Sequence, residues 1–205
     1  MKNIAIFLFA ATSLAGCSKK EADPQPTVIA PTPIQAATIN VAFDYYATGT
    51  SPASIQSLSL LATKPMYQQF PDRLQIKLEA LNSNNFVQDR VLFAIPISRQ
   101  KAGLVGTYTL ASQPDAGLGE VLVTYTRPSN STSAFDNVYG TNSARLEGNV
   151  AITSYDAGRR LISGSYTVKV INVKGPFSFL DTSSASDPRR DGDLRLTGTF
   201  TELPL

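Results

Sequence analysis

The chain contains few residue types that could perform chemistry. Its 205 residues include no histidine, no tryptophan and a single cysteine, Cys17. Without histidine there is no Ser-His or Cys-His nucleophile pair and no imidazole ligand for a metal. A lone cysteine also excludes zinc ribbons and disulfides within the chain. Carboxylates, tyrosines, lysines and hydroxyl groups remain.

Carboxylates are the remaining acid–base groups, and fourteen of the sixteen acidic residues follow residue 37. A glycosidase needs two carboxyl groups that face each other across the scissile bond. Most of these acidic residues lie at the ends of expected strands or, like Glu79 and Glu147, alternate with core positions, so their side chains should point outward. We therefore expect no catalytic residue and no enzyme, with a carboxylate-dependent glycan hydrolase as an alternative.

The tightest acidic cluster surrounds Gly192 and contains Asp187, Asp191 and Asp193. Oxygen ligands on a sharp turn can bind calcium, but this segment lacks the alternation and the closing glutamate of an EF-hand loop. Two arginines also lie within it. The favoured interpretation is an Asp-Gly turn that leads into the last strand. We expect no metal and no cofactor, with calcium at these three aspartates as the lesser alternative.

Aromatic side chains are the remaining candidates for ligand contact. Tyr45 and Tyr46 place one ring on each face of their strand, so a buried Tyr45 leaves Tyr46 partly exposed. The other candidates lie in or near loop-like stretches, where a ring can stack on a sugar or fill a pocket of a partner. The expected contact residues are Tyr46, Tyr67, Phe135 and Tyr139. Alternatively, the loop rings cap the open ends of the fold.

The first residues resemble the signal peptide of a bacterial lipoprotein. Lys2 is followed by an apolar stretch over residues 4–11, which is too short to span a bilayer. Leu14-Ala15-Gly16-Cys17 then resembles a lipobox, whose cysteine is acylated and becomes the first residue after cleavage. The resemblance implies a signal peptide over residues 1–16 and a membrane partner reached through acyl chains on Cys17. Two or three such chains give stable anchoring.

Residues 17–37 resemble a tether. They contain four prolines and no aromatic residue, and polar sequence of this kind cannot bury a core. No aspartate directly follows Cys17, which resembles lipoproteins that are sorted to the outer membrane. The expected location is the bacterial cell envelope, with the chain lipid-anchored at the outer membrane on its periplasmic face or at the cell surface.

From Thr38 onward, apolar and polar residues alternate with a period of two, which is typical of strands with one buried face. Examples are Ile39-Val41-Phe43, Leu74-Ile76-Leu78 and Val121-Val123-Tyr125. Clusters of turn residues separate these runs. The sequence predicts a single all-β domain over residues 38–205, as an antiparallel β-sandwich or a partly closed β-barrel of about eight to ten strands.

Two segments carry local predictions. Residues 54–62 favour either a short helix or another strand. The segment Asp156-Ala157-Gly158-Arg159 lies between two alternating runs and predicts a hairpin, in which Gly158 supplies a positive φ.

Residues 104–108, 162–166 and 196–200 share one pattern, in which an apolar residue, any residue, glycine, a hydroxyl residue and an aromatic residue follow one another. Gly164 and Gly198 fall on the apolar phase, so their missing side chains leave room on the core face for a bulky neighbour. Core packing and coiling of the sheet is the favoured interpretation. A cleft floor formed by glycine is the alternative.

The strand motifs and the lipobox together resemble small uncharacterised Bacteroidota lipoproteins with an all-β domain. The likeness includes Gly106-Thr107-Tyr108, residues 148–156 and the closing Gly198-Thr199-Phe200, and it covers most of the chain after the signal peptide. It implies a location and a fold, and no catalytic residue comes with it.

The net charge of the chain indicates which class of partner to expect. The chain has 18 basic and 16 acidic residues, a net charge of +2, and its longest basic runs are pairs. A nucleic-acid partner is therefore not expected. We expect a non-catalytic binding or structural accessory whose partner is an envelope protein or a glycan. A calycin-like barrel that carries a small ligand is a further alternative.

Overall fold

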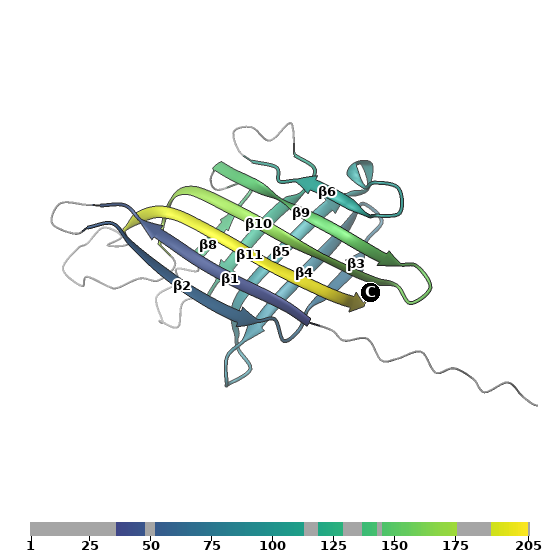
Figure 1. Cartoon of the computed structure of the whole chain (residues 1–205), viewed down its shortest axis with the longest axis horizontal. Helices are drawn as coiled ribbons and strands as arrows, with labels where there is room; N and C mark the ends of the chain where they lie inside the picture. The colour runs from purple at the N-terminus through teal and green to yellow at the C-terminus, as the bar shows by residue number, and fades with distance from the viewer. Residues whose placement is uncertain are drawn as a thin grey trace, which may run out of the picture. The chain divides into compact units, whose positions relative to one another are not determined.

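The alternating apolar pattern forms eleven strands in the part of the chain that the computed structural model describes (Figure 1). This part comprises residues 36–47, 52–112, 119–128, 137–142, 145–175 and 190–204, all within one compact unit, Pro33–Leu205. The strands are β1 (Ala36–Tyr45), β2 (Ser54–Leu61), β3 (Met66–Gln69), β4 (Arg73–Leu81), β5 (Val87–Pro96), β6 (Gly106–Thr109), β7 (Leu122–Arg127), β8 (Asn137–Gly140), β9 (Arg145–Asp156), β10 (Leu161–Lys174) and β11 (Asp191–Pro204).

The strands form two sheets that pack face to face. One sheet has six strands in the order β2-β1-β11-β10-β9-β6, and the other has five in the order β3-β4-β5-β7-β8. Neighbouring strands run antiparallel in both sheets. Figure 1 shows the five-stranded sheet crossing behind the six-stranded one. Over the described residues the sheets do not close into a barrel, so the predicted antiparallel β-sandwich is confirmed.

Helical structure in the described residues is confined to one 3₁₀ turn, η1 (Ile97–Arg99). In the same residues, no helix has the length and apolar character that crossing a bilayer requires. The segment that favoured a helix or a strand forms β2, which pairs along its length with β1.

The hairpin predicted around Gly158 is present between β9 and β10, but the expected role of Gly158 was wrong. Arg160, with φ of 55°, takes the left-handed conformation instead. The Asp156 carboxylate accepts a hydrogen bond from the Arg159 backbone N–H at 2.9 Å. An aspartate that bonds the backbone a few residues on stabilises a turn of this kind without a glycine at positive φ.

The core lies between the inward faces of the two sheets. Ile39, Phe43, Leu78 and Phe93 are fully buried. The rings of Phe93 in the five-stranded sheet and Tyr166 in the six-stranded sheet meet with centroids 5.0 Å apart. Since burial contributes roughly 25 cal/mol per Å² of apolar surface, this layer supplies most of the stabilisation of the fold.

Glycine and aromatic residues face each other at the centre of the six-stranded sheet. In the β10–β11 pairing, Gly164 lies opposite Phe200, and Tyr166 lies opposite Gly198. A Cβ on Gly164 would be 2.6 Å from the Phe200 ring, and one on Gly198 would be 2.6 Å from the Tyr166 hydroxyl. Each ring therefore occupies the space that its glycine partner leaves. Core packing, the favoured interpretation, therefore explains the pattern at Gly164 and Gly198. At Gly106, the third repeat, a Cβ would instead lie 2.6 Å from the Lys101 side chain.

Adding a methyl group at Gly198 should destabilise the protein sharply. The new Cβ would lie 2.1 Å from the Thr38 carbonyl oxygen, so the β1–β11 pairing would have to shift. We expect Gly198→Ala to lower the free energy of unfolding by at least about 2 kcal/mol, measured by chemical denaturation.

Gly158→Ala is the matched control. A Cβ at this position has Asp156 Oδ1 at 3.5 Å as its nearest neighbour, an ordinary contact. The free energy of unfolding should change by no more than about 0.5 kcal/mol. Equal effects of the two substitutions would contradict the close packing at Gly198.

Candidate binding groove

The four aromatic residues expected to contact a ligand have different surroundings. Tyr46 is exposed, as predicted, with 38% of its surface accessible, and its hydroxyl donates a hydrogen bond to Asp193. Phe135 lies outside the described residues, as do the expected acylation site Cys17 and the aspartate Asp187.

The placement of Tyr67 and Tyr139 in loop-like stretches was wrong. They lie in β3 and β8 of the five-stranded sheet and are buried. The Tyr67 hydroxyl donates to the Arg160 carbonyl at 2.9 Å, and the Tyr139 hydroxyl donates to the Lys174 carbonyl, both in the six-stranded sheet or its turn. Burial raises the pKa of Tyr67 to about 12. These two rings join the sheets and do not face solvent.

The two described aspartates of the acidic cluster lie in β11 and point to lysines. Asp191 pairs with Lys174 at 3.0 Å, and Asp193 pairs with Lys169 at 3.0 Å. Within the described residues, no three acidic, cysteine or histidine side chains converge on a common point.

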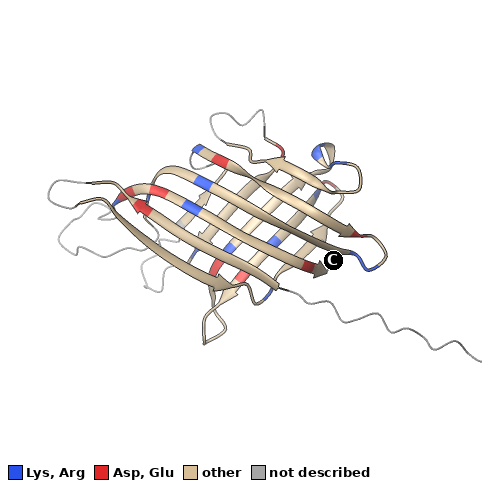
Figure 2. Ribbon diagram, viewed as in Figure 1, with Lys and Arg blue, Asp and Glu red and all other residues tan. Residues whose placement is uncertain are grey.

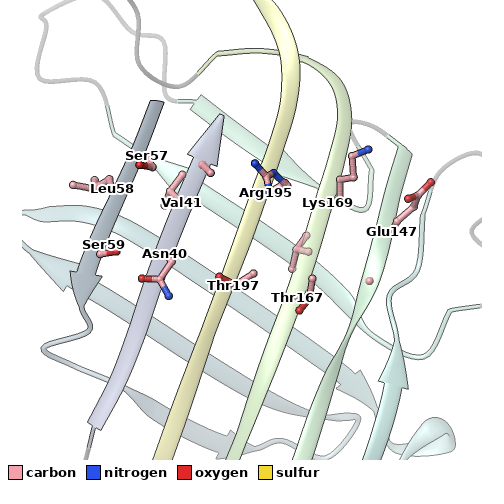
Figure 3. A pocket seen from close by; sticks show the side chains of 13 residues that line it. Asn40, Val41, Ser57, Leu58, Ser59, Glu147, Thr167, Lys169, Arg195 and Thr197 are labelled. Atoms are coloured by element: carbon pink, nitrogen blue, oxygen red, sulfur yellow. The ribbon is translucent and has the colours of Figure 1, made fainter. Parts of the chain in front are cut away.

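A hollow of about 460 Å³ lies on the outer face of the six-stranded sheet, away from the core (Figure 3). We call it the polar groove. It is lined by residues of five strands: Asn40, Val41, Ala42, Ser57, Leu58, Ser59, Glu147, Gly148, Thr167, Val168, Lys169, Arg195 and Thr197. Five of its lining residues are uncharged and polar and three are charged, although most of the lining surface is apolar. The described residues that line it include no aromatic ring.

Strand register assembles the groove from residues far apart in the sequence. Ser59 lies opposite Asn40, Asn40 opposite Thr197, and Thr197 opposite Thr167. The same row continues through Asn149 of β9 to Thr109 of β6. Strands in a sheet are about 4.8 Å apart, so a row of six side chains spans roughly 24 Å. The result is a continuous line of hydroxyl and amide groups.

The hydroxyl and amide groups in the groove are not used by the fold. Asn40, Ser57, Ser59, Thr167 and Thr197 form no side-chain hydrogen bond with any other described residue. Each can both donate and accept. The groove therefore offers at least five uncommitted polar groups on one surface.

Charged side chains bound the groove at one end, where β1 ends and β11 begins (Figure 2). The Arg195 guanidinium holds Asp44 with two contacts, of 2.8 and 2.9 Å. Lys169 holds Asp193, and Glu147 lies 3.5 Å from Arg145. Figure 3 shows Arg195, Lys169 and Glu147 side by side on adjacent strands. Acidic and basic groups thus compensate each other beside the neutral row.

Asp193 organises this charged end. A bulge between Val170 and Val173 turns the Asn172 backbone N–H toward the Asp193 carboxylate, at 3.1 Å. Partial burial works against ionisation of Asp193. Hydrogen bonds from the Tyr46 hydroxyl and the Lys169 ammonium, with the positive charge of the lysine, outweigh burial and lower the pKa of that carboxyl. Asp193 therefore stays ionised and keeps Lys169 in place.

Among the residues that the structure describes, two carboxylates are buried, and neither lies in the groove. Glu79, on the outer face of the five-stranded sheet, contacts Arg90 at 2.6 Å and Lys77 at 3.4 Å. It points away from the core, as its alternation predicted, but it is covered by these two cations. Asp89 is fully buried inside the sandwich and bonds the Tyr125 hydroxyl and the Arg127 guanidinium.

Comparison with protein-family models, curated proteins and solved structures found no match to this chain. What the groove can bind must therefore be inferred from its own side chains.

Replacement of Asp89 should separate the effect of its charge from that of its hydrogen bonds. Asp89→Ala removes the acceptor for Tyr125 and Arg127, so we expect a loss of about 2–4 kcal/mol in the free energy of unfolding. Asp89→Asn keeps an acceptor oxygen and should cost less.

The pH dependence has a definite sign. Burial raises the pKa of Asp89 above its ordinary value of 3.8, although Tyr125 and Arg127 act in the opposite direction. The folded state then binds the proton more tightly, so this contribution to stability is largest at acid pH and is lost as pH rises through the folded pKa. As pH falls from 8 to 4, the free energy of unfolding of the wild type, measured by denaturation, should rise relative to that of Asp89→Asn. Parallel curves would contradict the raised pKa.

Proposed function

We propose that this chain is a lipid-anchored, non-catalytic binding protein of the bacterial cell envelope, and that it binds a neutral glycan in the polar groove. One observation carries the glycan assignment. Five uncommitted hydroxyl and amide side chains lie together on a hollow of about 460 Å³. Sugar hydroxyls are donors and acceptors at once, as these side chains are.

The charge arrangement supports a neutral ligand over a polyanion. The cations at the end of the groove, Arg195 and Lys169, are each held by a carboxylate within 3.0 Å. A polyanion would have to displace Asp44 and Asp193 from these cations, whereas a neutral chain along the row from Ser59 to Thr167 leaves them paired. The described lining residues offer no aromatic ring for stacking, so orientation of the sugar rests on hydrogen bonds worth about 1 kcal/mol each, beside contacts with the apolar part of the lining.

The packing supports an accessory over a carrier. A carrier of the calycin type holds its ligand inside a barrel, whereas here the sheets do not close over the described residues, and side chains such as Phe43, Phe93 and Tyr108 pack between them. Binding without cleavage is supported by the groove itself. Asp44 and Asp193 beside it are engaged by basic partners, and Glu147 lines it near Arg145.

Removing hydroxyl groups from the groove without changing shape should weaken glycan binding. Thr167→Val/Thr197→Val deletes two neighbouring hydroxyls on β10 and β11. After a glycan array identifies a neutral oligosaccharide, calorimetry should show roughly tenfold to thirtyfold weaker binding for this variant, because two hydrogen bonds are lost. Thr126→Val/Thr201→Val is the matched control, on exposed or half-buried strand positions outside the groove, and should bind like wild type.

Salt concentration provides a second criterion. Binding of a neutral glycan should change less than about twofold between 50 and 500 mM salt, because screening acts on charges. A steep loss of affinity with salt, or equal effects of the groove and control variants, would overturn the glycan assignment.

The anchor is a separate part of the proposal and rests on the sequence Leu14-Ala15-Gly16-Cys17. In a bacterial host, wild type should incorporate labelled palmitate and fractionate with membranes. Cys17→Ser should lose the label and leave the membrane fraction, because no thiol remains to carry acyl chains. Ser18→Ala is the control and should retain both. An unlabelled wild type would contradict lipid anchoring.

A further inference from the structure

β2 is a long sheet edge without the usual protection. It ends the six-stranded sheet and, among the described strands, pairs only with β1. Its eight residues, SIQSLSLL, include no charge and no proline, the devices that normally prevent edge-to-edge pairing. The other edge strands, β3, β6 and β8, have only four residues each.

The backbone groups available on this edge can be assigned. The Ala62 backbone N–H donates to the Ala37 carbonyl of β1 at 2.8 Å. In an antiparallel pair, alternate residues direct both backbone groups to the same neighbour, so even-numbered residues of β2 bond to β1. The N–H and C=O groups of the odd-numbered residues point away from the sheet: Ile55, Ser57, Ser59 and Leu61.

We propose that β2 pairs antiparallel with β2 of a second copy of this chain, around a two-fold axis at Leu58. This register matches every odd-numbered residue with another. Ile55 faces Leu61 of the second copy, and Ser57 faces Ser59 of the second copy. In this register, all four odd-numbered residues of each strand can bond through their free backbone groups. An isologous interface requires such self-complementarity.

The same register covers the two most exposed apolar side chains of the strand. Ile55 and Leu61 are 67% and 73% exposed in the single chain, although both are large and apolar. Directly opposite residues of an antiparallel pair lie about 5 Å apart, so each of these side chains would pack against the other across the axis. A slip by two residues in either direction would separate Ile55 from Leu61 of the second copy, so neither would face a large apolar side chain.

Pairing of β2 strands joins two polar grooves into one surface. Ser57 and Ser59 line the groove of each copy and also lie at the paired edge. The two six-stranded sheets would become one continuous sheet. The neutral row of each copy, which ends at Ser59, would then face Ser57 of the second copy, whose own row continues through Ala42 to Arg195. The dimer does not depend on the glycan assignment, since it is formed by the strand alone.

Charge substitution at the two apolar positions tests both the dimer and its register. Sedimentation velocity on the full-length chain in a mild detergent, over a range of protein concentrations, should show a wild-type dimer. In Ile55→Lys/Leu61→Lys, like charges face each other across the axis, and dimerisation should weaken at least tenfold. Ile55→Lys/Leu61→Glu places opposite charges face to face and should restore the dimer. Both substitutions fall on highly exposed positions, so folding should be retained, as circular dichroism would verify.

Each other outcome overturns the proposal. A monomeric wild type rules out the dimer. If both double variants dimerise like wild type, the interface lies elsewhere. If both are equally monomeric, this register is wrong. Glycan binding by the monomeric Ile55→Lys/Leu61→Lys variant would show that the groove works alone, so the two proposals can fail independently.

Discussion

The contact on which the six-stranded sheet depends is the reciprocal packing of glycine and aromatic residues between β10 and β11. Phe200 lies over Gly164, and Tyr166 lies beside Gly198, so the two longest strands bring bulky rings to the core without pushing the sheets apart. The Tyr166 hydroxyl then reaches the Thr38 carbonyl at 2.9 Å, which ties β1 to the same centre. Because the inward face meets the whole requirement for apolar burial, the outward face of these strands can be polar.

The groove is formed by polar side chains on the outer face of the six-stranded sheet. Threonine, serine and asparagine alternate with the core residues along β1, β2, β10 and β11, and the antiparallel register aligns them across the sheet. Charges gather at one end, where the β10 bulge brings the Asn172 N–H to Asp193. Neutral and charged regions therefore occupy separate parts of one face, and the charged part is internally compensated.

How much could be predicted from the sequence depended on the range of each interaction. Alternation along a strand is local, so the sandwich, the inward direction of Gly164 and Gly198 and the exposure of Tyr46 were predictable. Tyr67 and Tyr139 were misplaced because their short strands, of four residues each, give almost no periodic pattern.

The groove was missed for a different reason. Its residues Asn40, Thr167 and Thr197 are ordinary solvent-facing residues one at a time, and only strand register brings them into one row. The burial of Asp89 likewise follows from its partners on β7, which lie 36 and 38 residues away.

The neighbours of β1 have a consequence for the order of folding. Ala36 pairs with Thr201, and Tyr45 pairs with Gly192, so the first strand lies against the last one. Contacts this distant in sequence raise the contact order and slow folding, because a long loop must close before they form. A growing chain would have no partner for this side of β1 until nearly all of its residues had been synthesised. Losing the last dozen residues would therefore remove the middle of the sheet, and the β1–β2 hairpin would have no strand between it and β10.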